Sequence, residues 1–230
     1  MMKNDKQISL SQIECTFKDR SWWAIIFNLY PAKYITYFLL NKTSITPNQV
    51  TTVSLLFAVF AGMAFWYDSF IAGAILYQVS FILDIVDGSI ARSKNQSSQI
   101  GAFYDVFTDW LKAPVLILLL FYKLDQVILG EIVIFLFFLN CCVNKYNDML
   151  FYTTKNSITK SENVKKSPLG RYFTYMKEKR LIALPGSVEV EGLILFLYAI
   201  SKNTLFVYFA IFLLLFSFVL RVYVITKKIK

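Results

Sequence analysis

Four aspartates stand in or beside two apolar segments of this 230-residue sequence, where ionisable side chains are rare. Asp84 and Asp87 are three residues apart, and Asp105 and Asp109 are four apart. On a helix, residues at these spacings share one face, so each pair points in a common direction. A charge inside a bilayer costs about 3 kcal/mol by insertion scales, so four acids at such places indicate a functional site.

The chemistry that four neighbouring carboxylates can perform is metal binding. Carboxylates gathered at one place repel each other, and some would have to take up protons. A hard divalent cation relieves this repulsion, and Mg²⁺ or Mn²⁺ takes oxygen ligands while leaving room for phosphate groups. Two such ions about 4 Å apart suit an in-line displacement at phosphorus. The acids therefore predict a site for two divalent cations that handles a phosphorylated substrate.

Small residues and one arginine accompany the acids. Gly88 and Ala91 lie on the face of the first pair, and Gly101 lies on the face of the second. Without large side chains, these positions leave space for a ligand to approach the backbone and the metal ions. Arg92 stands at the mouth of the expected site, where a guanidinium group can contact phosphate.

Two other interpretations of the acids are consistent with the sequence. They could form buried salt bridges with Arg92, Lys94 or Lys112, although four acids against one or two bases leave uncompensated charge. They could also line the path of a divalent-cation transporter, although the outer halves of the apolar segments carry no matching polar residues. Histidine is absent from the sequence, which excludes Ser-His and Cys-His mechanisms and His-ligated zinc.

The composition and the apolar segments place these acids in a membrane protein. The chain is 57% hydrophobic and 17% charged, with a net charge of +9 and a mean hydropathy of +0.52. Positive charge on such an apolar chain favours an anionic membrane surface or a phosphorylated ligand over nucleic acid. Six segments approach the length of about 20 residues that a spanning helix needs. They cover residues 48–67, 69–91, 102–122, 126–150, 182–200 and 204–226.

The loop between the second and third segments brings the two acidic pairs together. Residues 92–100 are polar and basic, so they form a turn that folds one helix back on the other. Lysine and arginine gather before residue 47, in this turn, between residues 145 and 180, and at the C-terminal end. By the positive-inside rule, both termini and the acids then face the cytoplasm.

The N-terminal part of the chain has a different character. Residues 18–41 mix aromatic and aliphatic residues with lysine and arginine, and Pro31 interrupts them. We expect one or two amphipathic helices in the cytoplasmic interface, with Trp22 and Trp23 at headgroup depth. Thr46 and Pro47 are the expected N-cap and first residue of the first span.

The predicted fold is an all-α integral membrane protein with two parts. Residues 1–46 form a cytoplasmic N-terminal segment that contains the amphipathic interfacial helix. Residues 47–230 form a catalytic domain of six transmembrane helices.

The acidic segment resembles the signature of a known enzyme family. The CDP-alcohol phosphatidyltransferases carry the pattern D-x2-D-G-x2-A-R-x8-G-x3-D-x3-D. All eight fixed positions are filled here, by Asp84, Asp87, Gly88, Ala91, Arg92, Gly101, Asp105 and Asp109. The likeness extends to the six expected spans, the N-terminal amphipathic helix and the Thr46-Pro47-Asn48 entry to the first span.

The resemblance implies a reaction and a role for each residue. An alcohol attacks the β-phosphorus of a CDP-alcohol, and CMP leaves. The implied metal ligands are Asp84, Asp87, Asp105 and Asp109. Asp109 is also the implied general base on the acceptor hydroxyl. The residues that would border the CMP moiety are Gly88, Ala91, Arg92, Gly101 and, from the first span, Asn48.

The resemblance also outlines the substrates and the setting. The expected donor is CDP-diacylglycerol, which transfers a phosphatidyl group in phospholipid synthesis. The alternative donor is CDP-inositol or another CDP-polyol, which transfers an inositol-phosphate group. The expected acceptor is a small alcohol or a phosphorylated polyol. The family is similar in forming homodimers, and we expect a homodimer in a prokaryotic cytoplasmic membrane.

Three residues are candidates for the acceptor site. The segment 145–180 is rich in bases, of which Lys145 and Arg171 are the candidates for binding a phosphorylated acceptor. The positive-inside bias explains the same bases without a ligand, so both interpretations stay open. Glu189 either caps the helix that follows Pro185 and Gly186, or binds the hydroxyl groups of a polyol acceptor.

Overall fold

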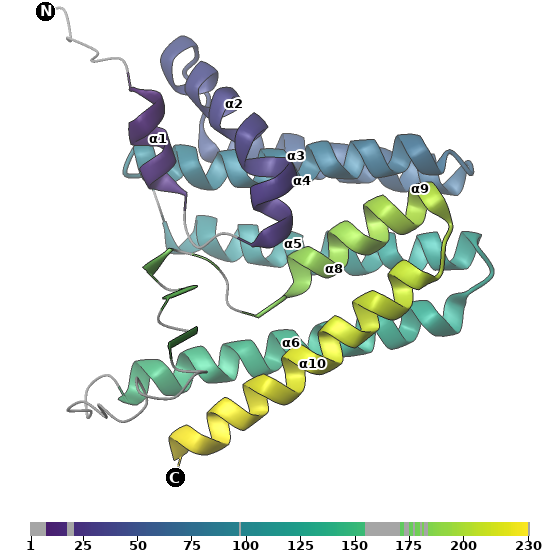
Figure 1. The fold of residues 1–230 in the computed structure, drawn as a ribbon. Coiled ribbons are helices and arrows are strands. Elements are labelled where there is room, and N and C mark those ends of the chain that lie inside the picture. Colours follow the sequence, from purple (N-terminus) through teal and green to yellow (C-terminus); the bar gives the residue numbers. More distant parts are fainter. Residues whose placement is uncertain are drawn as a thin grey trace, which may run out of the picture.

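The computed structural model of this chain describes residues 8–17, 21–96, 98–154, 171–172, 175–176, 178–179, 181 and 184–229. Within these residues the chain is a bundle of helices, which agrees with the predicted all-α class (Figure 1). The elements are α1 (Leu10–Thr16), η1 (Ala24–Asn28), α2 (Leu29–Lys42), α3 (Pro47–Trp66), α4 (Phe70–Ser93), α5 (Gln99–Lys123), α6 (Val127–Thr154), α8 (Ser187–Glu191), η3 (Gly192–Tyr198), α9 (Ala199–Ser201) and α10 (Leu205–Ile229). Both η elements are π-helical turns that continue into α-helix.

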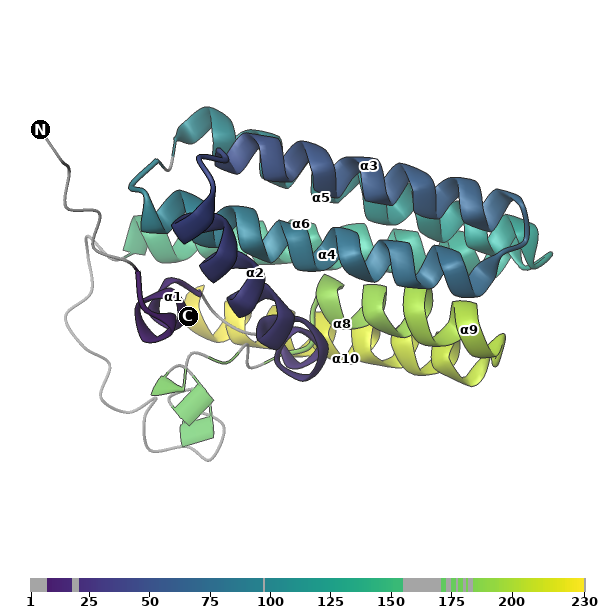
Figure 2. The same cartoon turned by 90° about the horizontal axis from the view of Figure 1, so that it is seen from above.

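The long helices lie lengthwise beside one another, and their connections alternate between the two ends of the bundle. The turns that join α3 to α4, α5 to α6 and α9 to α10 lie at one end (Figures 1 and 2). The turn between α4 and α5 lies at the other end, together with α1 and the C-terminal end of α10 (Figure 1). The acidic halves of α4 and α5 therefore lie toward the end of the bundle that also carries α1.

Among the residues that the structure describes, four helical stretches are long and apolar enough to cross a membrane: Pro47–Trp66, Phe70–Ser93, Val127–Asn147 and Leu205–Thr226. The first begins where the sequence predicts, because the Thr46 side chain accepts a hydrogen bond from the Gln49 amide and Pro47 occupies the first helical position. Helix α5 has 25 residues, but Asp105, Asp109 and Lys112 make it less apolar than these four. The charged residues that could perform chemistry therefore make α5 harder to identify as a membrane-spanning helix.

The fifth predicted span is shorter than expected and begins later. Its helical run comprises α8, η3 and α9, with five, seven and three residues. Gly186 is the extended N-cap of this run and follows Pro185, whose missing N–H and fixed φ do not continue a helix backwards. The predicted start at residue 182 is therefore wrong, and the helical run starts at Ser187.

The helical run formed by η1 and α2, which we call the N-terminal helix, differs from the prediction in two respects. Pro31 does not interrupt it, because the wide π-helical turn η1 lies directly before α2 and the helical run continues through Pro31. Trp22 is exposed but Trp23 is buried, and the Trp23 ring lies against the backbone of Gly192. Only Trp22 therefore presents its ring to the surroundings, whereas Trp23 anchors the N-terminal helix to η3.

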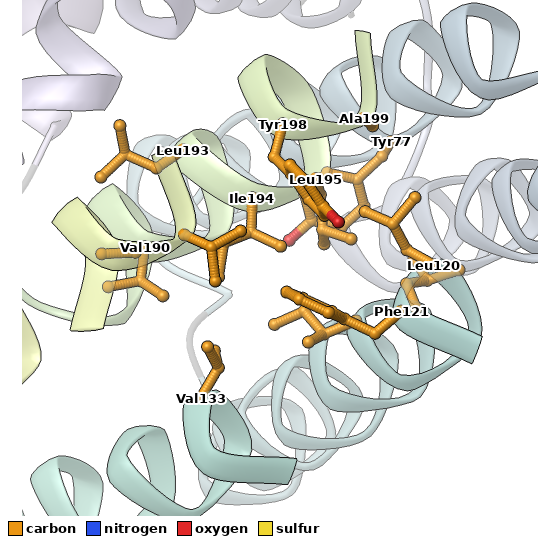
Figure 3. Close-up of a cluster of buried hydrophobic side chains, with 14 of the residues drawn as sticks. Tyr77, Leu120, Phe121, Val133, Val190, Leu193, Ile194, Leu195, Tyr198 and Ala199 are labelled. Atoms are coloured by element: carbon orange, nitrogen blue, oxygen red, sulfur yellow. The ribbon is translucent and has the colours of Figure 1, made fainter. Parts of the chain in front are cut away.

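Two apolar clusters hold the bundle together. The larger cluster contains residues of α3, α4, α5, α6, η3 and α10. Buried aromatic rings from three of these elements meet in it (Figure 3). Among them, Phe121 of α5 and Tyr198 of η3 have ring centroids 5.2 Å apart. The smaller cluster joins α1, α2 and α3 to the acidic half of α4 through Ile13, Ala32, Val50, Val86 and Ile90. The N-terminal helices thus cover one face of the helix that carries Asp84 and Asp87.

Candidate metal centre and active site

The four aspartates come together at the connected ends of α4 and α5. The turn between these helices is short, so they run in opposite directions, and α3 packs against both of them. Ser98 caps α5 by accepting a hydrogen bond of 3.0 Å from the Gly101 amide. Carboxylate oxygens of Asp84, Asp105 and Asp109 all lie within 4.8 Å of one another. The predicted meeting of the two acidic pairs is therefore confirmed for these three residues.

The donor set of this cluster fits a hard divalent cation. All three side chains offer oxygen atoms, which Mg²⁺ and Mn²⁺ prefer, and they come from two different helices. A cation bound here would hold the ends of α4 and α5 together and offset the repulsion between the carboxylates. The cluster can therefore hold a divalent metal ion.

Asp87 contributes to the same region from a more deeply buried position. Its side chain is only 4% exposed, and its Oδ2 accepts a hydrogen bond of 2.6 Å from the Thr51 hydroxyl group. Thr51 belongs to α3, and its hydroxyl group also contacts the carbonyl group of Pro47. The first turns of α3 therefore orient one of the predicted metal ligands.

Lys112 lies inside the acidic cluster. Its Nζ is 2.6 Å from Oδ1 of Asp84 and 2.6 Å from Oδ1 of Asp109, and the residue is only 7% exposed. The salt-bridge interpretation of the acids is thus realised for Lys112, but one ammonium group cannot compensate four carboxylates. The ion pairs of Lys112 therefore leave carboxylate charge in the cluster uncompensated.

The small residues and Asn48 line the same end of α3, α4 and α5. A Cβ atom on Gly101 would lie 3.8 Å from Oδ1 of Asn48 and 3.0 Å from Oγ of Ser98. A Cβ atom on Gly88 would lie 3.1 Å from the Arg92 guanidinium group. Side chains at these two glycines would therefore fill space next to Asn48 and Arg92, which the family resemblance implies beside the nucleotide.

Arg92 and Ala91 close the C-terminal end of α4. The Arg92 Nε donates a hydrogen bond to the carbonyl oxygen of Thr16 at the end of α1, and Ala91 is half-buried. The Thr16 hydroxyl group is also hydrogen-bonded to Ser89. Helix α1 thus positions the guanidinium group beside Gly88, which the sequence did not indicate.

Glu189 is occupied by backbone donors. The Gly186 amide donates to Oε2 at 2.8 Å, and the Trp22 amide donates to Oε1 at 2.9 Å. Both oxygens therefore fix the start of α8 and its contact with the N-terminal helix. Of the two interpretations of Glu189, this arrangement favours the capping one.

The other two acceptor candidates lie apart from the aspartates. Lys145 on α6 and Arg171 are both exposed. Within the described part of the chain, no hydrogen bond or ion pair joins either residue to the four acids. Within the basic segment 145–180, residues 155–170, 173–174, 177 and 180 lie outside the described residues.

Comparison with known protein families identifies the family to which the chain belongs. The sequence model of the family described as CDP-alcohol phosphatidyltransferase matches residues 44–227, which include all four aspartates. The chain belongs to this family. As a family member with four helices long and apolar enough to span a bilayer, the phosphatidyltransferase homologue is an integral membrane protein.

Curated proteins from several organisms are similar to part of this chain. It is 38% identical over 65 residues to the bifunctional IPC transferase and DIPP synthase of Thermococcus kodakarensis, which covers 28% of this chain and 15% of the relative. It is 35% identical over 72 residues to the archaetidylinositol phosphate synthase of Pyrococcus horikoshii, which covers 31% of this chain and 38% of the relative. The match spans less than half of each relative.

The sequence indicates Lys112 only as a possible salt-bridge partner of the acids, and it does not connect Thr51 or Glu191 to the site. Lys112 follows Asp109 by three residues on the same face, which is a local signal that it could reach the acids. Thr51 and Glu191 carry no such signal, because their partners Asp87 and Tyr77 are distant in the chain. The only hint for Thr51 and Glu191 is that each is a polar residue in an apolar segment, where a buried polar group needs a hydrogen-bond partner.

Proposed function

We propose that this chain transfers a phosphoalcohol group from a CDP-alcohol to an acceptor hydroxyl group and releases CMP. The observation that carries the proposal is the gathering of the Asp84, Asp105 and Asp109 oxygens within 4.8 Å at the joined ends of α4 and α5. Membership of the CDP-alcohol phosphatidyltransferase family supports this reaction class. Divalent cations, Mg²⁺ or Mn²⁺, are the proposed cofactors, and four carboxylates suffice for two of them.

The proposed ligands are Asp84, Asp87, Asp105 and Asp109. When bound, the ions would neutralise the donor pyrophosphate and the leaving phosphate group. The chain itself orients one of these ligands, because the Thr51 hydroxyl group holds Asp87.

Asp109 is the proposed general base. Its side chain is 42% exposed, against 13% for that of Asp84, so an acceptor can reach it more easily. Its Oδ1 faces Lys112, which leaves Oδ2 to take the proton from the acceptor hydroxyl group. No histidine exists to perform this step, and a carboxylate is a suitable base.

The proposed nucleotide site surrounds the two glycines of the motif. Gly88, Ala91, Arg92, Gly101 and Asn48 would border the CMP moiety. The closeness of Asn48 to Gly101, and of Arg92 to Gly88, supports this grouping. Arg92 would pair with phosphate, because its guanidinium group carries several donors besides the Nε that Thr16 uses.

Two donors are proposed, and they differ in which group moves. CDP-diacylglycerol would deliver a phosphatidyl group in phospholipid synthesis. CDP-inositol, or another CDP-polyol, would deliver an inositol-phosphate group. The names of the relatives favour inositol chemistry, since they include an archaetidylinositol phosphate synthase. The proposed acceptor is a small alcohol or a phosphorylated polyol, with Lys145 and Arg171 as candidate contacts.

The membrane arrangement is also a proposal. We propose six spans, in which α5 and the run from Ser187 to Ser201 cross with the four strongly apolar helices. Both termini and the active site would face the cytoplasm of a prokaryotic cell, because lysine and arginine gather in both terminal segments and in the turn between the acidic pairs. Residues 1–46 would lie at the interface, and the exposed rings of Trp22, Tyr30 and Phe38 support contact with lipid. The functional unit is proposed to be a homodimer.

The test is CMP release by the purified chain in detergent or nanodiscs. CDP-diacylglycerol and CDP-inositol are each offered with glycerol phosphate, inositol phosphate and free polyols, with Mg²⁺, with Mn²⁺ or with EDTA. We expect metal-dependent CMP release from one donor, and Asp109→Asn should lower kcat by about 100-fold or more while CMP binding is retained. Flux of Mn²⁺ into liposomes without CMP release from any donor would instead establish a transporter.

A further inference from the structure

The feature that the reaction does not explain is the lysine within the acidic cluster. Lys112 is 7% exposed, and its ammonium group joins Asp84 of α4 to Asp109 of its own helix at 2.6 Å each. Lysine is almost never buried unless it is paired, and removal of one partner leaves a costly uncompensated charge. Lys112 therefore links the ends of α4 and α5 through their carboxylates.

The same two carboxylates belong to the set that can hold a metal ion. Asp84 and Asp109 are two of the three acids whose oxygens lie within 4.8 Å of one another. An ammonium group and a divalent cation repel each other strongly at the distances found within one such cluster. A metal ion that uses both Asp84 and Asp109 must therefore weaken or replace the contacts of Lys112.

The surroundings offer the displaced ammonium group another partner. Glu191 is a further buried acid near Lys112 and Asp84. Glu191 is held in place by a hydrogen bond from Tyr77 and lies on the helical run that packs against α4. An ammonium group that leaves Asp84 therefore remains near an acid.

We propose that Lys112 is a displaceable internal cation of this metal centre. It stabilises the metal-free centre by bridging Asp84 and Asp109, and it competes with divalent cations for these two ligands. Of the two proposed ions, one that uses both Asp84 and Asp109 then binds more weakly than one that does not. This inference rests on the proposed function, because it assumes that the four aspartates bind metal.

The experiment compares the full chain with Lys112→Met, using MnCl₂ as the only ligand. Thermal unfolding in EDTA measures the metal-free centre, and Mn²⁺ titration followed by electron paramagnetic resonance measures the binding steps. We expect Lys112→Met to lower the metal-free Tm by roughly 5 °C. We expect its weaker Mn²⁺ step to tighten by about tenfold, because the competing cation and its repulsion are gone.

Lys123→Met is the matched control. Lys123 lies at the other end of α5 and forms an ion pair of 3.0 Å with the exposed residue Asp68. Its removal should leave both Mn²⁺ steps unchanged, since an exposed pair far from the acids contributes little. If Lys112→Met does not fold, Lys112→Gln replaces it, because glutamine removes the charge and keeps a donor.

The outcomes separate this inference from the proposed function. Two equal Mn²⁺ steps in the unmodified chain, or unchanged or weaker Mn²⁺ binding in the Lys112 variant, would overturn the role of Lys112 and leave the enzyme proposal standing. An unmodified chain that binds no Mn²⁺ at all would overturn both.

Discussion

The Thr51 hydroxyl group donates a hydrogen bond of 2.6 Å to Oδ2 of Asp87, and both residues are buried. This bond joins α3 to the acidic half of α4, 36 residues further along the chain. It makes an apolar helix part of the proposed metal centre, because a partner of this kind fixes the direction in which a metal ligand points.

Thr51→Val should therefore weaken metal binding without changing the shape of the side chain. Outer-shell partners of metal ligands contribute about tenfold or more to metal affinity, and we expect a loss of that size. Titration of the chelator-treated protein with Mn²⁺ measures it. Thr52→Val is the control, because the exposed Thr52 hydroxyl group bonds only to the Asn48 carbonyl group of its own helix. Equal affinities in both variants would contradict the assigned role of Thr51.

Loss of a metal ligand should have a larger effect than loss of its partner. Asp84→Asn removes a charged oxygen from the three-residue cluster and also one contact of Lys112. We expect a loss of Mn²⁺ affinity beyond the tenfold or so of an outer-shell change, and no CMP release at Mn²⁺ levels that saturate the unmodified chain. Asp68→Asn, at the opposite end of the bundle, should behave like the unmodified chain. Full activity of Asp84→Asn would remove Asp84 from the site.

Chelation should test the same cluster without mutation. EDTA should abolish CMP release, and added Mg²⁺ or Mn²⁺ should restore it, because the carboxylates alone cannot neutralise a pyrophosphate. The measurement is CMP release before and after the metal is returned. Undiminished activity in EDTA, after metal analysis has verified that the protein is metal-free, would contradict the proposed cofactor.

The contact between the N-terminal helix and η3 can be tested at a glycine. A Cβ atom on Gly192 would lie 2.1 Å from the Trp23 ring, so Gly192→Ala must displace the indole group. We expect a loss of about 1–3 kcal/mol in the free energy of unfolding, as in other overpacked cores. Gly186→Ala, whose nearest contact is 3.8 Å, is the control and should lose far less. Thermal unfolding and tryptophan fluorescence in one detergent would measure both, and equal stabilities would contradict the docking of Trp23.

The bond between Tyr77 and Glu191 predicts a difference between two tyrosines. Tyr77→Phe leaves a buried carboxyl group without its donor, which costs about 1–3 kcal/mol. Tyr198→Phe removes a bond of 2.8 Å to the neutral side chain of Gln126 and should cost about 1 kcal/mol or less. The two losses are compared by thermal unfolding. A larger loss for Tyr198→Phe would show that Glu191 does not depend on Tyr77.

The sequence by itself determined the features that depend on local helix geometry. The spacing of Asp84 to Asp87 and of Asp105 to Asp109 placed each pair on one face, and the short polar turn brought the pairs to one end. Thr46 and Pro47 marked the start of α3 correctly, because capping involves only neighbouring residues.

Only the tertiary structure decided which residues complete the site. Lys112 reaches Asp84 across two helices, Thr51 reaches Asp87 from α3, and the backbone of the N-terminal helix occupies Glu189. These contacts depend on how each helix is rotated and shifted along its axis against its neighbours. Many residues of an apolar helix can face a neighbour equally well, so packing of the whole bundle selects the pairs that form.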